Sequence, residues 1–262
     1  MCVQDFFEAK SAGHKISMVT CYDYTFARLL SKSAIDGILV GDSAGMVMHG
    51  HSSTLSMNVG LMRLHAEAVV RGAPGKFIVV DMPFLSFRKG LSAALDAAHL
   101  LVAAGAHAVK LEGVDGHEDV IQRLAQSGIP VMGHVGLQPQ SVRAYGGFRV
   151  QGRSDKSAGG ILRQATTLEE LGAFAVVLEC IPASVAQEIT QAVRIPTIGI
   201  GAGAGCDGQI LVLQDLLGMN MDFRPRFARA FSDGARCILD AVANFDGAVK
   251  TGRFPTLEES YS

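Results

Sequence analysis

The sequence predicts an α/β fold, a (β/α)8 TIM barrel in which residues 1–262 form a single domain. Short apolar runs alternate with longer helical patterns, most of these runs are apolar on both faces, and one strand–helix–strand unit occurs twice. Parallel strands that are covered by helices read as near-continuous apolar runs, unlike the alternating strands of antiparallel sheets. A length of 262 residues is normal for one barrel of this kind.

Eight apolar runs are the candidate strands. Seven of them alternate with helical patterns, and the eighth follows the seventh after only a short crossover. In chain order the runs are Ile16–Cys21, Gly37–Asp42, Phe77–Asp81, Ala108–Glu112, Pro130–Val135, Ala175–Glu179, Thr197–Gly201 and Gln209–Leu213. This rhythm favours the barrel over an open doubly wound sheet, and no G-x-G-x-x-G motif follows the first strand to support that alternative.

Amphipathic stripes predict helices between the strands. The stripes consist of Leu91, Leu95, Ala98 and Val102 in one helix and of Val185, Ile189 and Val193 in another. Ser184 is expected to cap the second helix. The repeated unit begins at 105–113 and again at 172–180, and each copy leads through a helix into a similar strand.

The composition limits the possible functions. The net charge is −2 without a long run of one sign, so we expect neither a nucleic-acid partner nor a membrane surface. No apolar run approaches the ~20 residues of a membrane span, and the N-terminus lacks the features of a signal peptide. The five cysteines are scattered and contain no C-x-x-C pair, which indicates reduced thiols and a cytoplasmic location.

A long segment without periodicity, residues 136–160, follows the fifth strand. Loops of this length in a compact domain are usually functional or disordered. Its arginine and aromatic content predicts a lid or a binding loop. The alternative is a surface excursion or a subunit contact.

Polar residues end five successive candidate strands. In a parallel barrel the C-terminal ends of all strands share the face that holds the active site, so residues far apart in sequence converge there. Lys110 and Glu112 are two residues apart and point to the same side of their strand. The complete set is Asp42, Asp81, Lys110, Glu112, His134 and Glu179.

Several carboxylates and a lysine in one apolar cup would be costly without partners. A divalent cation removes this difficulty, and Asp and Glu oxygens without a cysteine cluster favour a hard ion, most simply Mg²⁺. Such an ion could chelate the carboxylate and keto oxygens of a 2-keto acid and act as a Lewis acid.

Each of these residues also has a simpler interpretation. Asp42 could cap the following helix, and Asp81 could satisfy a loop. Lys110 could be an internal ion-pair partner, and His134 a core histidine. Glu179, like Glu112, could be solvated in a loop. Capping alone does not explain polar groups at the same end of five strands.

Three further features are weaker candidates. The glycine-rich segment 199–208 could hold a phosphate or simply form a close helix–sheet turn, and it lacks the ending of a P-loop. His49 and His51 in a loop are not enough for a metal site. Cys180 has no evident histidine partner, which argues against a role as a nucleophile.

Taken together, the motifs resemble the ketopantoate hydroxymethyltransferase family from about residue 5 to 255. The motifs that carry the resemblance are "TCYDYTFARLL" from Thr20, "ILVGDSAGMVMHGHSSTL" from Ile38, "VVRGAP" from Val69, "VVDMPF" from Val79, "AVKLEG" from Ala108, "VMGHVGLQPQSV" from Val131, "VLECIP" from Val177 and "IGIGAGAGCDGQILV" from Ile198.

The resemblance implies a Mg²⁺-dependent barrel enzyme and a homo-oligomer, typically a decamer. The family transfers the one-carbon unit of 5,10-methylenetetrahydrofolate to 3-methyl-2-oxobutanoate through a Mg-bound enolate, giving 2-dehydropantoate on the route to pantothenate and coenzyme A. By motif match, the metal ligands are Asp42, Asp81 and Glu112. The keto-acid contacts are Asp42, Ser43, Asp81 and Lys110. Glu179 matches the proton acceptor, Lys110 a group that holds the substrate carboxylate or enolate charge, and His134 a histidine near the substrate.

The chain departs from the family pattern at a few positions. Ser56, Phe87 and Gln214 stand where the family commonly has Pro, Tyr and His, and the N-terminus is short. None of these positions is a metal or base position, so they bear on subunit contacts and folate binding. Two competing interpretations remain, a Mg²⁺-dependent C–C lyase of a 2-oxo acid and a catalytically idle barrel that binds or assembles.

Overall fold

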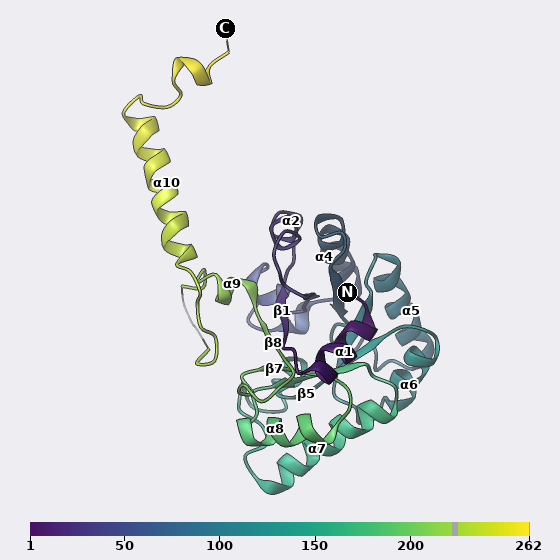
Figure 1. Cartoon of the computed structure of the whole chain (residues 1–262). Coiled ribbons are helices and arrows are strands. Elements are labelled where there is room, and N and C mark those ends of the chain that lie inside the picture. Colours follow the sequence, from purple (N-terminus) through teal and green to yellow (C-terminus); the bar gives the residue numbers. More distant parts are fainter. Residues whose placement is uncertain (222–224, 262) are drawn as a thin grey trace. The chain divides into compact units, whose positions relative to one another are not determined.

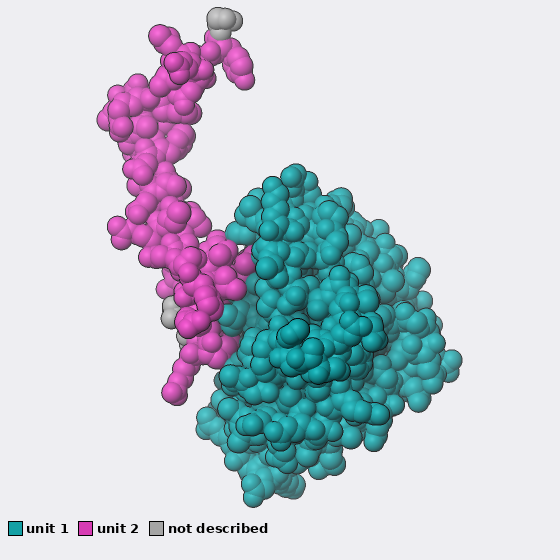
Figure 2. Space-filling model, viewed as in Figure 1, with its two compact units in different colours: residues 1–212 teal, residues 213–262 magenta. Residues whose placement is uncertain are grey.

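The structure is a computed structural model that describes residues 1–221 and 225–261. It contains two compact units, residues 1–212 and residues 213–262, which Figure 2 shows in different colours. The barrel is complete within the first unit. That residues 1–262 form a single domain stays a prediction.

Eight parallel strands close into a barrel in which every strand pairs with its neighbours in sequence and β8 returns to β1. The predicted TIM barrel is therefore confirmed, with strand ends within one or two residues of the expected ones. The strands are β1 (Ile16–Thr20), β2 (Gly37–Val40), β3 (Phe77–Asp81), β4 (Ala108–Glu112), β5 (Val131–Gly136), β6 (Ala175–Glu179), β7 (Thr197–Ile200) and β8 (Gly208–Leu211).

Helices surround the strands of this unit (Figure 1). They are α1 (Val3–Ala12), α2 (Tyr24–Leu30), α3 (Ala44–Val47), α4 (Val59–Gly72), α5 (Leu91–Ala103), α6 (Glu118–Gln126), α7 (Asp155–Glu170) and α8 (Ala183–Ala192), with 3₁₀ turns η1 (Thr54–Ser56) and η2 (Pro139–Ser141). Residues 201–207, all of them described, form turns and no helix between β7 and β8. The two copies of the repeated unit begin with β4 and β6, two βα units apart, and lead through a helix into β5 and β7.

The strands separate two apolar layers. One layer lies between the strands and the helices. The other fills the barrel interior and includes Val79, Met132 and Val177, with Phe6 of α1 packed against its lower end. Because side chains alternate along a strand, the next residue on the interior face of each of these strands lies two positions further on. Those positions carry the polar residues of the predicted site.

The predicted helix over Leu91–Val102 is confirmed as α5: Ala98 is buried, and Leu91, Leu95 and Val102 are partly buried and pack against the same core. Two other local expectations are wrong. Ser184 does not cap α8, because the helix begins at Ala183 and its N-cap is Pro182. The segment 136–160 is not irregular throughout, because residues 155–160 already belong to α7, whose N-cap Ser154 accepts a hydrogen bond from the Ser157 N–H.

The second unit contains α9 (Leu213–Leu216), α10 (Gly234–Lys250) and η3 (Leu257–Glu259). Within this unit α10 has no buried residue. Its exposed apolar side chains are Ile238, Leu239, Val242, Phe245 and Val249. Within residues 1–221 and 225–261, no helix is both long enough and apolar enough to cross a membrane.

Candidate active site

The strand register brings the predicted site residues to one end of the barrel. Asp81 lies beside Lys110 in the β3–β4 ladder, and Glu112 lies beside His134 in the β4–β5 ladder. Glu179 closes β6 opposite the last residue of β5. The four strands thus carry their polar ends to neighbouring positions around the mouth, as the sequence predicts.

A buried ion pair links β3 to β4. The Lys110 ammonium lies 2.8 Å from Asp81 Oδ1, and both side chains are almost fully buried. Asp81 Oδ2 accepts a hydrogen bond of 3.0 Å from the backbone N–H of Asp42. Asp81 therefore anchors the loop after β2, which was the simpler interpretation of this residue. It also holds Asp42 at the mouth.

Gln140 connects two of the predicted metal ligands. Its side-chain amide donates a hydrogen bond of 2.8 Å to Asp42 Oδ2 and another of 3.0 Å to the carbonyl oxygen of Met82. Its backbone N–H donates to Glu112 Oε2 at 2.9 Å. Gln140 is itself buried. The long loop after β5 therefore contributes a residue to the cluster, and at this point it is not a surface excursion.

The Asp42 carboxylate does not cap a helix. The residue at the N-cap of α3 is Ser43, and it makes no side-chain capping bond. The Ser43 hydroxyl instead lies 2.8 Å from the hydroxyl of Tyr22, a fully buried residue just beyond β1. This contact fixes the position of the Ser43 side chain beside Asp42.

His134 lies between two carboxylates. Its Nε2 is 3.2 Å from Glu179 Oε2, and its Nδ1 is 3.6 Å from Glu112 Oε1. The same Nδ1 lies 3.3 Å from the Lys110 ammonium. Burial, followed by the charge of Lys110, lowers the pKa of His134. A neutral imidazole can accept from Lys110 at Nδ1 and donate to Glu179 from Nε2.

The cluster holds more negative charge than its one lysine balances. Burial, and then the charge of Asp81, raises the pKa of Asp42 to about 7. Burial, and then the charge of Asp42, raises the pKa of Glu112 well above its ordinary value. Burial alone would lower the pKa of Lys110, but the charges of Asp81, Glu112 and Asp42 outweigh burial and raise it. The lysine therefore stays charged.

Among the residues that the structure describes, no group of three or more His, Cys, Asp or Glu side chains is placed to hold a metal ion as it stands. The oxygens of Asp42, Asp81 and Glu112 are directed to Lys110, to Gln140 and to the backbone instead. The assignment of these three residues as metal ligands stays a prediction.

The weaker candidates lie outside this cluster. His49 Nε2 lies 2.9 Å from Nε2 of His65, a residue of α4. Burial, and then the charge of Glu179, raises the pKa of Cys180 to about 12, so this thiol is protonated at neutral pH. In the glycine-rich segment, the Asp207 carboxylate accepts from the Thr197 N–H, which ties the turn to β7.

Sequence reasoning missed Gln140 and Tyr22. Both stand after the C-terminal end of a strand, but at different distances from it. The signal was present for Tyr22, which lies two residues beyond β1. Gln140 lies four residues beyond β5. Its contact with Asp42 depends on how the loop folds back over the mouth, which no local pattern encodes.

A family model described as ketopantoate hydroxymethyltransferase matches residues 1–257. The chain belongs to the ketopantoate hydroxymethyltransferase family. A 3-methyl-2-oxobutanoate hydroxymethyltransferase of Bdellovibrio bacteriovorus is 54% identical over 260 residues, which cover 99% of each chain. One from Coxiella burnetii is 51% identical over 98% of this chain and 97% of its own. The chain is thus a transferase of the ketopantoate hydroxymethyltransferase family, as predicted.

Solved structures share the fold of this family at low sequence identity. A phosphoenolpyruvate phosphomutase of Streptomyces platensis superposes with a TM-score of 0.63 at 14% identity, covering 100% of this chain and 92% of its own. A phosphonopyruvate hydrolase gives a TM-score of 0.63 at 13% identity, covering 99% and 93%. At such low sequence identity these similarities show the fold alone.

Proposed function

We propose that the chain transfers a hydroxymethyl group from 5,10-methylenetetrahydrofolate to 3-methyl-2-oxobutanoate, giving 2-dehydropantoate for pantothenate and coenzyme A synthesis. Family membership supports the reaction. The observation that carries the proposal is the position of Glu179, whose Oε2 lies 3.2 Å from His134 Nε2, beside a buried cluster of Lys110 and carboxylates. A 2-keto acid needs both a cationic partner for its oxygens and a base near the carbon next to its carbonyl group.

The carboxylates of the cluster suit a hard cation, and we assign Asp42, Asp81 and Glu112 to hold Mg²⁺. Their oxygens are the ligands that this ion prefers. The raised pKa values of Asp42 and Glu112 agree with the assignment, because burial and then a neighbouring carboxylate disfavour the charged form, which a bound cation would favour. When bound, the ion would act as a Lewis acid toward the keto acid and acidify its C3 proton.

The protein side chains have separate tasks in this reaction. Lys110 holds the substrate carboxylate and stabilises the charge of the enolate. Ser43, Asp42 and Asp81 contact the same substrate oxygens. Glu179 removes the C3 proton. His134, whose Nε2 lies 3.2 Å from Glu179 Oε2, orients this base. The buried positions of Lys110 and His134 keep bulk water away from the enolate.

The overall reaction balances with one water molecule. The C3 carbanion equivalent forms a C–C bond to the methylene carbon, and both C–N bonds of that carbon break. Water supplies the hydroxyl oxygen. The C3 proton and one water proton end on the two folate nitrogens, which gives tetrahydrofolate. No oxidant or reductant is needed.

Replacing the proposed base tests the assignment directly. We expect Glu179→Gln to lower exchange of the C3 proton with deuterated water by at least about a thousandfold, because an amide cannot accept the proton. NMR of 3-methyl-2-oxobutanoate measures the exchange. Glu188→Gln, on the exposed face of α8, is the matched control and should exchange like the parent protein. Exchange that persists in Glu179→Gln would rule out this base.

We also propose a cytoplasmic homo-oligomer, with the decamer of the family as its form. The apolar row on α10 supports assembly, since Ile238, Val242, Phe245 and Val249 recur at helical spacing and stay exposed within their unit. We expect Phe245→Asp to reduce the mass measured by light scattering after size exclusion. Asn244→Asp adds the same charge one residue away and should leave the mass unchanged. A parent protein that elutes as a monomer would refute the oligomer.

A further inference from the structure

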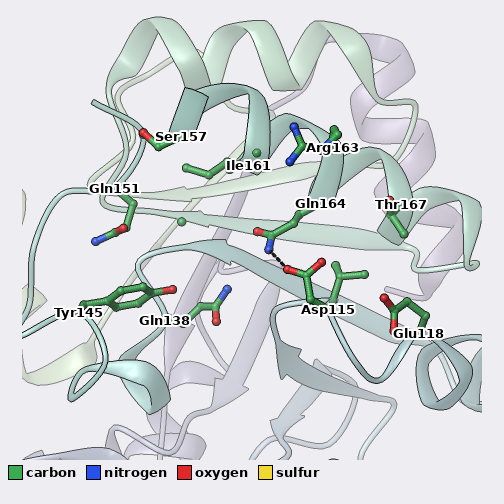
Figure 3. Close-up of a pocket in the computed structure, with 14 residues that line it drawn as sticks. Asp115, Glu118, Gln138, Tyr145, Gln151, Ser157, Ile161, Arg163, Gln164 and Thr167 are labelled. Carbon is green, nitrogen blue, oxygen red and sulfur yellow. Dashed lines mark hydrogen bonds between the residues drawn. The ribbon is translucent and has the colours of Figure 1, made fainter. Parts of the chain in front are cut away.

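A cavity of about 340 Å³ lies between the loop that follows β5 and helix α7 (Figure 3). Residues of the β4–α6 loop form a third side. In Figure 3, Tyr145 and Gln138 face Ile161 and Gln164 of α7 across the hollow. We propose that this cavity binds the pterin ring of the folate that supplies the one-carbon unit. This proposal rests on the proposed function.

The cavity adjoins the reacting groups. Gly136, in its wall, ends β5 two residues beyond His134 and stands in register with Glu179. Gln138, also in the wall, lies so close to Gly113 that a Cβ atom on this glycine would be 3.2 Å from the Gln138 amide atoms. Gly113 directly follows Glu112. The inner wall is therefore built from immediate neighbours of the proposed base and of a proposed metal ligand.

Tyr145 gives an independent sign of this proximity. Burial, and then the charge of Glu112, raises the pKa of its phenol. The direction of this shift agrees with the geometry, in which the cavity wall at Gln138 lies beside Gly113, the residue that follows Glu112.

The size of the cavity matches one part of a folate. Pockets for small molecules span about 300 to 1,000 Å³, and this cavity is at the lower end of that range. It can accept a two-ring heterocycle but not the heterocycle together with the aminobenzoyl-glutamate tail. The ring of Tyr145 and the side chain of Ile161 offer apolar surface to a flat ligand.

The charge of the lining selects the pterin end rather than the tail. Asp115 and Glu118 face the cavity with Arg163 as the cation among the lining residues. Two carboxylates disfavour the dianionic glutamate tail. The 2-amino and N3–H groups of a pterin are donors that a carboxylate accepts well. Asp115 Oδ2 is oriented by a hydrogen bond of 2.7 Å from the Gln164 amide, drawn in Figure 3.

The transfer reaction also requires the pterin end of the folate to bind near the keto acid. The one-carbon unit bridges a pterin nitrogen and the neighbouring aminobenzoyl nitrogen, so the pterin must lie close to the carbon that accepts it. With the pterin in the cavity, the methylene carbon points toward the mouth and the glutamate tail toward solvent. The keto acid and the folate then occupy adjoining sites.

The test separates folate binding from proton removal. We expect Asp115→Asn and Gln164→Leu each to raise KM for 5,10-methylenetetrahydrofolate about tenfold, the usual effect of losing a charge-assisted contact or its orientation. KM for 3-methyl-2-oxobutanoate and the folate-independent C3 exchange should stay within about twofold. Gln191→Leu, an exposed residue of α8, is the matched control and should change none of these values.

Competition identifies the end of the folate that binds. We expect 6-hydroxymethylpterin to inhibit competitively with the folate and to lose potency about tenfold in Asp115→Asn, while p-aminobenzoylglutamate at the same concentration does not compete. An unchanged KM for the folate in both variants, or competition by p-aminobenzoylglutamate alone, would refute pterin binding in this cavity. Neither result would contradict the proposed transfer reaction. If the parent protein makes no product when the folate is present, both the proposed function and the proposal of pterin binding are refuted.

Discussion

The two ends of the barrel interior differ in what fills them. At the N-terminal end, the ring of Phe6 from α1 lies 5.1 Å from Phe77 and 5.4 Å from Phe174. At the C-terminal end, the same strand faces carry Asp81, Lys110 and their neighbours. In β3, β4 and β6 the interior face thus changes from apolar to ionic within two residues. Stability and chemistry are therefore assigned to opposite ends of the same strands.

The largest expected effect tests the C-terminal end. We expect Glu112→Gln to lower kcat/KM for the transfer reaction about a thousandfold, because a proposed ligand of the cation is lost. Its Tm in a chelator should be unchanged or higher, since burial and Asp42 already disfavour the ionised carboxylate. Calorimetry and steady-state rates measure the two effects, with the exposed Glu170→Gln of α7 as control. A variant that keeps its activity but melts much earlier would reverse the assignment.

The next effect tests the N-terminal end. We expect Phe6→Ala to lower the free energy of unfolding by about 3–5 kcal/mol, because it leaves a cavity among three aromatic rings. Activity per folded molecule should stay within about twofold of the parent. Phe6→Leu, which leaves less empty volume, should lose less stability. A large loss of kcat in folded Phe6→Ala protein would show that the two ends are not independent.

The smallest effect links pH, cation and stability. Burial and Asp81 raise the pKa of Asp42 from its ordinary value of 3.8 to about 7, so the folded state holds this proton more tightly than the unfolded state. Stability from this group is therefore lost as pH rises from about 4 to about 7. We expect Mg²⁺, which replaces the proton, to stabilise the fold by about 2–3 kcal/mol at roughly a hundred times its Kd.

Thermal unfolding with and without Mg²⁺ checks this link. The gain in Tm should be larger at about pH 8 than at about pH 5.5, because the proton no longer competes for Asp42. Asp42→Asn should show a weaker pH dependence and a weaker response to Mg²⁺. An equal gain in Tm for both proteins at both pH values would contradict the role of Asp42.

The parts of the fold that local sequence encodes could be predicted. The strand runs and the convergence of Asp81, Lys110 and Glu112 follow from periodicity and from the shared end of parallel strands. The contact of Gln140 with Asp42 could not be predicted, because it depends on the path of a loop across the mouth. Ser184 failed as a cap because Pro182 already fixes the entry to α8. The apolar residues of α10 also recur at helical spacing, but this spacing does not show which partner surface the row of Ile238, Val242, Phe245 and Val249 contacts.

Helix α1 also bears on how the chain acquires its structure. The Lys10 ammonium contacts the carbonyl oxygens of Thr190 and Ile195 and the carboxylate of Asp207. During synthesis, Lys10 therefore waits for almost two hundred later residues before all of its partners exist. Contacts so distant in sequence slow folding, because a long loop must close before they form. The Lys10 end of α1 is therefore fixed in place only when synthesis has reached the residues just before the last strand.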